Sequence, residues 1–163
     1  MRALLLLSLL LALNTAHGAE DVAFDMTIYI KAPKAAVWKA LVDPATASTY
    51  FMCPLLRMGG AAGEEVAYGR AGKVLIAGKI VTYVPEATLA HTFVFDPASH
   101  KGTAGDAPST VHYTLSEEDG ITTLALRHDG FAKEDQTYAN IVGGWPWILS
   151  NLKTCLETGR PLR

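Results

Sequence analysis

Histidine side chains are the first candidates for chemistry in this sequence. An imidazole titrates near neutral pH, so a histidine inside a pocket can act as an acid, a base or a hydrogen-bonding partner. His128 alternates in step with Leu124 and Leu126, which predicts that it points toward the core face of a strand. His91 shares the parity of Leu89 in another strand. Both are candidate catalytic residues, although either could instead bond to a backbone group in the core.

The other polar residues form no recognisable catalytic or metal-binding motif. The sequence has no HExxH pair, no Cys/His cluster and no GxSxG nucleophile motif. The stretch GRAGK differs from a phosphate-binding loop, because Ala67 and Val74 replace the first glycine and the Ser/Thr of that motif. We therefore expect no metal ion and no cofactor. His112 is expected to face outward, and Asp96 and His100 to be solvated in a long loop.

Two tryptophans flank a proline in the stretch GGWPWILSNLKTCLETG, residues 143–159. Proline is tolerated in the first turn of a helix, so a helix is predicted from Pro146 to Thr158, with Gly159 as its stop. Gly143 and Gly144 would give a pivot before it. Trp147 is expected on the helix flank. The predicted apolar stripe, at steps of three and four, comprises Trp145, Ile148, Leu149, Leu152, Cys155 and Leu156.

Apolar and aromatic side chains facing such a stripe can form either a plain core or the wall of a cavity. Aromatic walls supply contact area, and a tyrosine or histidine can fix the orientation of a ligand. Each candidate can also be explained as core packing, and both interpretations stay open. The candidate ligand-binding residues are Phe51, Tyr68, Tyr83, Phe93, Phe95, His128, Trp145 and Leu149.

The sequence contains two cysteines, Cys53 and Cys155. In an oxidising compartment the two could pair as a disulfide. Cys155 also lies on the apolar helix stripe, where a free thiol behaves as a small hydrophobic side chain. The spacing in the sequence does not decide between the two.

Residues 1–18 have the pattern of a secretory signal peptide. Arg2 gives a basic start, residues 3–13 are apolar apart from one serine, and small residues precede Ala19 where a signal peptidase reads them. The apolar run is shorter than the roughly 20 residues that cross a bilayer. An uncleaved anchor or a buried first helix is the alternative. We predict cleavage before Ala19, export to the periplasm or the medium, and no membrane span afterwards.

The remaining chain, residues 19–163, is long enough to bury a sizeable core and is predicted to form one domain. It has 13 basic and 16 acidic residues, a net charge of −3. No basic stripe is present, which argues against a nucleic-acid partner.

Hydrophobic periodicity predicts an α+β fold, in which a curved antiparallel sheet wraps around a long C-terminal helix. Two short helices follow the first strand. The loop at 96–108 is long enough to be functional or mobile, and Asp119-Gly120 predicts a tight hairpin. The predicted strands are 22–31, 65–68, 74–84, 88–95, 109–116 and 121–128, and the predicted short helices are 34–42 and 45–50.

Two stretches resemble a known family. The start, TIYIKAPKAAVWKALVDPATASTYF, is similar to the opening of START-like, or SRPBCC, helix-grip domains. The end resembles the branch named after the activator of heat-shock-protein-ninety ATPase, in its C-terminal-domain-like form. The resemblance covers about residues 23–162. The residues that carry the match at the end are His128, Gly130 and Phe131, followed by Gly144, Trp145, Leu152, Lys153, Leu156, Glu157 and Gly159.

The resemblance implies a sheet of seven elements gripping the C-terminal helix, with a hydrophobic cavity between them. It also implies a small apolar or amphipathic ligand in many relatives and polyketide cyclisation in some. Co-chaperone relatives act on a cytosolic ATP-driven chaperone, and an export signal would separate this chain from both. The loop at 96–108 is longer than the connection in most relatives.

Three hypotheses follow. The first is an exported domain that binds a small hydrophobic or amphipathic molecule without catalysis. The second is a protein-interaction module, which a filled cavity beside Trp145 would favour. The third is a cyclase- or hydrolase-like enzyme that uses His128 or His91 with a tyrosine.

Overall fold

The structure is a computed structural model and describes residues 22–162. The predicted signal peptide, residues 1–18, lies outside the described residues. Seven strands form one antiparallel sheet in the order β1-β7-β6-β5-β4-β3-β2. The elements are β1 (Val22–Ile30), α1 (Lys34–Val42), α2 (Pro44–Tyr50), β2 (Leu55–Met58), β3 (Glu65–Arg70), β4 (Lys73–Val84), β5 (Thr88–Phe95), β6 (Ser109–Glu118), β7 (Ile121–Phe131) and α3 (Gln136–Thr158).

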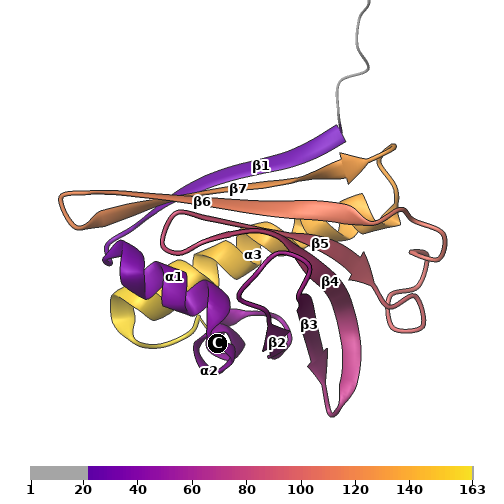
Figure 1. The fold of residues 1–163 in the computed structure, drawn as a ribbon, viewed down its shortest axis with the longest axis horizontal. Coiled ribbons are helices and arrows are strands. Elements are labelled where there is room, and N and C mark those ends of the chain that lie inside the picture. The colour runs from indigo at the N-terminus through magenta and orange to yellow at the C-terminus, as the bar shows by residue number, and fades with distance from the viewer. Residues whose placement is uncertain (1–21, 163) are drawn as a thin grey trace, which may run out of the picture.

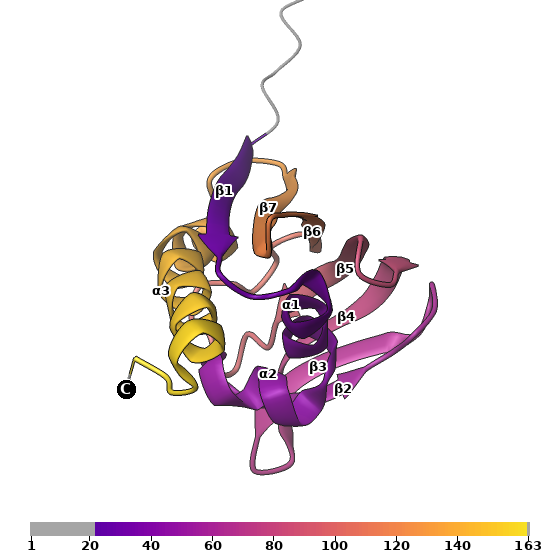
Figure 2. The ribbon, with the colours of Figure 1, turned by 90° about the vertical axis from the view of Figure 1, so that its left-hand side faces the viewer.

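The sheet curves around α3, and the two short helices lie between the C-terminal part of α3 and strands β2 and β3 (Figures 1 and 2). The predicted fold class is confirmed. The core lies between the sheet and one face of α3, where Ile141, Trp145, Ile148, Leu149 and Leu152 are buried. Their spacing of three and four residues keeps them on one stripe of the helix.

The prediction for the start of the last helix was wrong. α3 begins at Gln136, ten residues before Pro146, which lies inside the helix together with Gly143 and Gly144. Asp135 caps the N-terminus, because its side chain accepts a hydrogen bond from the backbone N–H of Tyr138 at 2.8 Å. The stripe of Trp145 continues backward to Ile141, so burial outweighs the cost of the proline and glycines. The predicted stop at Gly159 is confirmed, with φ of 75°.

The strand predictions differ from the structure mainly at the ends. β2 was not predicted, because it is only four residues long and stands beside a glycine-rich stretch. β6 and β7 extend beyond the predicted ends, and they meet in the hairpin expected at Asp119-Gly120. Both turn residues have positive φ, 50° and 74°, as a two-residue hairpin of this type requires.

Candidate functional site

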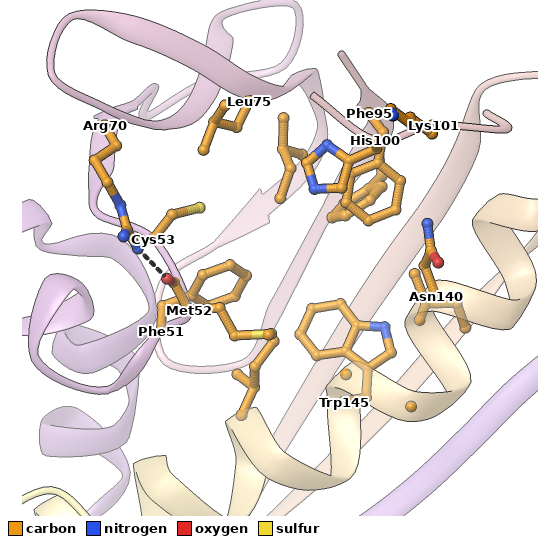
Figure 3. Close-up of a pocket in the computed structure, with 16 residues that line it drawn as sticks. Phe51, Met52, Cys53, Arg70, Leu75, Phe95, His100, Lys101, Asn140 and Trp145 are labelled. Carbon is orange, nitrogen blue, oxygen red and sulfur yellow. Dashed lines mark hydrogen bonds between the residues drawn. The ribbon is translucent and has the colours of Figure 1, made fainter. Parts of the chain in front are cut away.

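A cavity of about 530 Å³ opens between α3 and the strands β3, β4 and β5 (Figure 3). Its volume falls in the range of small-molecule sites, about 300–1,000 Å³. Segments far apart in the sequence build it: the end of α2, the sheet, the loop after β5 and the middle of α3. The aromatic part of its wall consists of Phe51, Phe93, Phe95 and Trp145.

Four of the predicted ligand-binding residues line the cavity, and four do not. The four aromatic residues just named form a connected wall: Phe51 and Trp145 meet edge-on at 6.1 Å between ring centroids, and Phe93 meets Phe95 at 4.9 Å. The predicted residues that do not line it are Tyr68, Tyr83, His128 and Leu149.

Two of these four residues contact the wall from behind: Tyr68 stacks against Phe51 with ring centroids 4.4 Å apart, and His128 meets Trp145 at 5.9 Å. Tyr83 packs edge-on against Trp38, away from the cavity, at 5.1 Å. Leu149 is almost fully buried on the core side of α3. Strand parity in the sequence cannot separate a residue in the wall from the residue behind it.

His128 is fully buried and both of its ring nitrogens are engaged. The indole Nε1–H of Trp145 donates to Nδ1 at 2.9 Å, so the neutral ring carries its proton on Nε2. That N–H then donates to Ser109 Oγ at 2.8 Å, and the Ser109 hydroxyl donates to the carbonyl of Phe93 at 3.3 Å. This chain of three hydrogen bonds holds Trp145 in the cavity wall and leaves His128 no free nitrogen.

His91 is also buried, but only one of its nitrogens has a partner. Nδ1 donates to the carbonyl of Thr92 at 2.8 Å, and Nε2 has no hydrogen-bond partner among the described residues. The ring lies between Tyr68 and Tyr113, with centroids 6.3 and 6.2 Å away. His91 does not line the cavity.

Burial keeps both histidines neutral. Desolvation lowers the pKa of His128 to about 3 and that of His91 to about 4. The same cause raises the pKa of Tyr68 and that of Tyr113 well above the usual value of a tyrosine. None of these groups is therefore poised to exchange protons near neutral pH, which general acid–base catalysis requires.

His100 was expected to be solvated, and the structure corrects this. Its ring lies against Phe95 with centroids 4.1 Å apart, and it lines the cavity. Its Nδ1 atom is buried without a hydrogen-bond partner among the described residues. Loop residues have no alternation in the sequence that would reveal which way they point, so no sequence signal could have placed it.

Other polar residues at the cavity were missed because they lie outside the predicted strand 65–68 and the predicted helix 146–158. Arg70, at the end of β3, donates from Nη2 to the carbonyl of Met52 at 2.8 Å (Figure 3). Lys101 follows His100 in the loop after β5, and Asn140 lies in the first part of α3. No acidic side chain is among the residues that line the cavity.

Gly143 and Gly144 line the cavity from within α3. A Cβ atom at Gly143 would meet nothing within 4 Å, and one at Gly144 would meet only Met52 Sδ, at 3.8 Å. Neither glycine has a positive φ. Packing and backbone conformation therefore do not require glycine at these positions, although each glycine costs a helix about 1 kcal/mol relative to alanine.

The two cysteines are free thiols, so the structure does not contain the disulfide considered from the sequence. Cys53 is buried and lines the cavity, and desolvation raises the pKa of its thiol. Cys155 is half-buried on α3.

The part of the chain that the structure describes contains no group of three or more His, Cys, Asp or Glu side chains able to hold a metal ion. Within residues 22–162, no helix combines the length and apolar character needed to cross a bilayer.

Solved structures share this fold at low sequence identity. Protein MLL2253 from Mesorhizobium loti aligns with a TM-score of 0.68 and 24% identity, over 83% of this chain and 96% of that one. CalU16 from Micromonospora echinospora aligns with a TM-score of 0.66 and 24% identity, over 85% and 76% of the two chains. The Aha1 dimer from Colwellia psychrerythraea gives 0.66 and 18%, over 85% and 98%. No curated protein matches the chain.

The family model described as "Activator of Hsp90 ATPase homolog 1-like protein" matches residues 31–157, most of the chain. This match agrees with the resemblance of both ends of the sequence and with the sheet that grips a C-terminal helix. The chain therefore belongs to the activator of Hsp90 ATPase homolog 1-like family, within the START-like helix-grip superfamily.

Proposed function

We propose that this protein binds a small hydrophobic or amphipathic molecule in the cavity between the sheet and α3, without transforming it. The observation that carries the proposal is the cavity itself, with its wall of four aromatic residues. Burial of apolar ligand surface stabilises a complex by about 25 cal/mol per Å² before the costs of binding are subtracted.

The glycine pair supports a binding role. Gly143 and Gly144 weaken α3 at the one stretch of the helix where missing side chains enlarge the cavity. The two glycines lower the stability of the helix and are not needed for packing. Such a cost is expected at positions where function requires open space.

A protein-interaction module is less well supported, because that hypothesis expects no room beside Trp145, and the cavity borders this residue. An enzyme that uses His128 is also less well supported. Both nitrogens of His128 are occupied and Trp145 stands between the ring and the cavity. His91 has an unpartnered nitrogen but does not line the cavity.

We further propose that the protein is exported, on the basis of the signal-peptide pattern in residues 1–18. The ligand would then be a molecule of the periplasm or the medium, where ATP-driven cytosolic chaperones are absent.

Native mass spectrometry of the protein purified gently from its host tests the binding proposal. We expect an additional mass that is reproducible and is lost on denaturation. Gly144→Leu, whose Cβ would point toward the cavity-lining Met52 at 3.8 Å from its Sδ, should fill the space and abolish it. Gly60→Leu is the matched control and should retain it, because an added side chain there meets nothing within 4 Å, the φ is not positive and the residue does not line the cavity. A bare mass for the unaltered protein, together with no binding of added apolar molecules, would refute the proposal.

A further inference from the structure

We propose that the ligand of the cavity is an amphipathic organic anion. Its apolar body would fill the aromatic part of the cavity, and its negative group would lie at the mouth, in the positive field of Arg70 on one side and Lys101 on the other. This inference rests on the proposed function, because it specifies the chemistry of the molecule that the cavity binds.

The charge around the mouth is of one sign. Arg70 and Lys101 line the cavity, His100 lies beside Lys101, and no aspartate or glutamate is among the lining residues. The protein as a whole is slightly acidic, with a formal net charge of −2. The positive charge at the mouth is therefore a local feature rather than a consequence of overall composition, and it favours a negative ligand group.

Neither basic residue is neutralised within the described part of the chain. Arg70 contacts only a backbone carbonyl, that of Met52, and this bond orients the guanidinium while most of its N–H groups stay available. Lys101 forms no ion pair with a described residue. Lys73, by contrast, lies 3.1 Å from Asp96 and is paired.

The uncharged polar groups at the cavity can also act as donors. Asn140 accepts at Oδ1 from the side chain of Gln136 at 3.0 Å, which leaves its Nδ2 amide to donate. The buried Nδ1 of His100 lacks a partner and can donate in the tautomer that protonates it. His100, Lys101 and Asn140 lie on one side of the cavity, and Arg70 on the other (Figure 3). An anionic oxygen can accept hydrogen bonds from these groups. A cationic ligand group would be repelled by Arg70 and Lys101 and could not accept a hydrogen bond from His100 or Asn140.

The deeper wall is apolar, as Phe51, Phe93, Trp145 and Ile148 show. A small free anion such as phosphate would leave this surface empty, and a neutral hydrocarbon would leave the buried Nδ1 of His100 without a partner and gain nothing from the charges of Arg70 and Lys101. Only a molecule with both parts matches the whole lining.

Two fluorescent probes with the same aromatic frame test the inference. Anilinonaphthalene sulfonate carries a negative group, and phenylnaphthylamine lacks it. Both are titrated into the purified full chain and into Arg70→Gln/Lys101→Gln. The control Lys79→Gln/Arg160→Gln removes the same charge at exposed positions that do not line this cavity. Gly144→Leu, which places a side chain against the cavity-lining Met52, reports whether each probe occupies the cavity.

We expect the sulfonate to bind more tightly than the neutral probe. Arg70→Gln/Lys101→Gln should weaken the sulfonate roughly three- to tenfold and leave the neutral probe unchanged. Added salt should weaken only the sulfonate. The control should match the unaltered protein, and Gly144→Leu should weaken the binding of both probes. Circular dichroism checks that each variant folds, and the single variants replace the double one if it does not.

Equal binding of both probes, unaffected by Arg70→Gln/Lys101→Gln, would overturn the anion inference and leave the proposed function standing. If neither probe shows binding that Gly144→Leu abolishes, both the anion inference and the proposed function are overturned.

Discussion

Trp145 and His128 show at the scale of single residues how a cavity wall is held in place. An indole N–H and an imidazole must both find partners when buried. Here each satisfies the other, and Ser109 completes the chain. These hydrogen bonds fix the orientation of a large aromatic ring that borders the open space of the cavity.

Trp145→Phe should destabilise the protein by about 1–3 kcal/mol, because it leaves Nδ1 of His128 buried without a donor. Urea unfolding measures the loss. In a His128→Leu background the same substitution should cost much less, because no acceptor is then left unpaired. Equal losses in the two backgrounds would show that the hydrogen bond does not couple these residues.

The two buried histidines should make the protein sensitive to acid. Their pKa values, about 3 and about 4 in the folded state, lie below the ordinary value of 6.5, so the unfolded chain binds more protons below pH 6.5. Stability is therefore complete above that pH and falls as the pH drops, by about 2 kcal/mol per histidine between pH 7 and pH 5.

Urea unfolding at several pH values between 5 and 7 measures this slope. His91→Phe should flatten it by about half, since one of the two buried titrating groups is removed. A slope that His91→Phe leaves unchanged would mean that His91 does not contribute.

At the scale of elements, helix α3 contains residues that lower its helix propensity at the stretch that borders the cavity. Pro146 has no N–H to donate to the carbonyl of Val142, and Gly143 and Gly144 lower the intrinsic helix propensity. The helix persists because it buries five large side chains toward the sheet. Three of these side chains also line the cavity: Ile141, Trp145 and Ile148. The weakened stretch faces the cavity, where the missing side chains leave room.

Gly143→Ala should raise the free energy of unfolding by about 0.5–1 kcal/mol, because the helical backbone is kept and the added methyl group meets nothing within 4 Å. Gly130→Ala should do the opposite, because Gly130 has φ of 85°, where a side chain is strained. Thermal unfolding compares the two variants. A destabilising Gly143→Ala would contradict the view that this glycine serves the cavity rather than the fold.

The whole molecule combines a predicted export signal with a cavity that opens between sheet and helix. We expect the intact mass of the protein from its host to match a chain that begins at Ala19. Ala16→Trp places a bulky residue where the peptidase needs a small one, and it should leave the chain uncleaved. Thr15→Val, one position earlier, should not. An unaltered protein that retains Met1 would contradict the prediction.

The sequence by itself determined the fold class, the order of the elements apart from β2, and the buried face of the strands that carry His91 and His128. Alternation of side chains along a strand and steps of three and four along a helix are local properties, so His91, His128 and Trp145 could be assigned to the core side. The hairpin at Asp119-Gly120 and the stop at Gly159 followed from backbone conformations that few residues adopt.

Only the tertiary structure decided which core-facing residues border open space. Phe51 lines the cavity and Tyr68 stands behind it, because the end of α2 places the ring of Phe51 over that of Tyr68 from β3. The start of α3 depended on burial of Ile141 outweighing a proline and two glycines. Arg70, His100 and Lys101 line the same cavity because distant segments of the chain pack together, and no local pattern in the sequence encodes that packing.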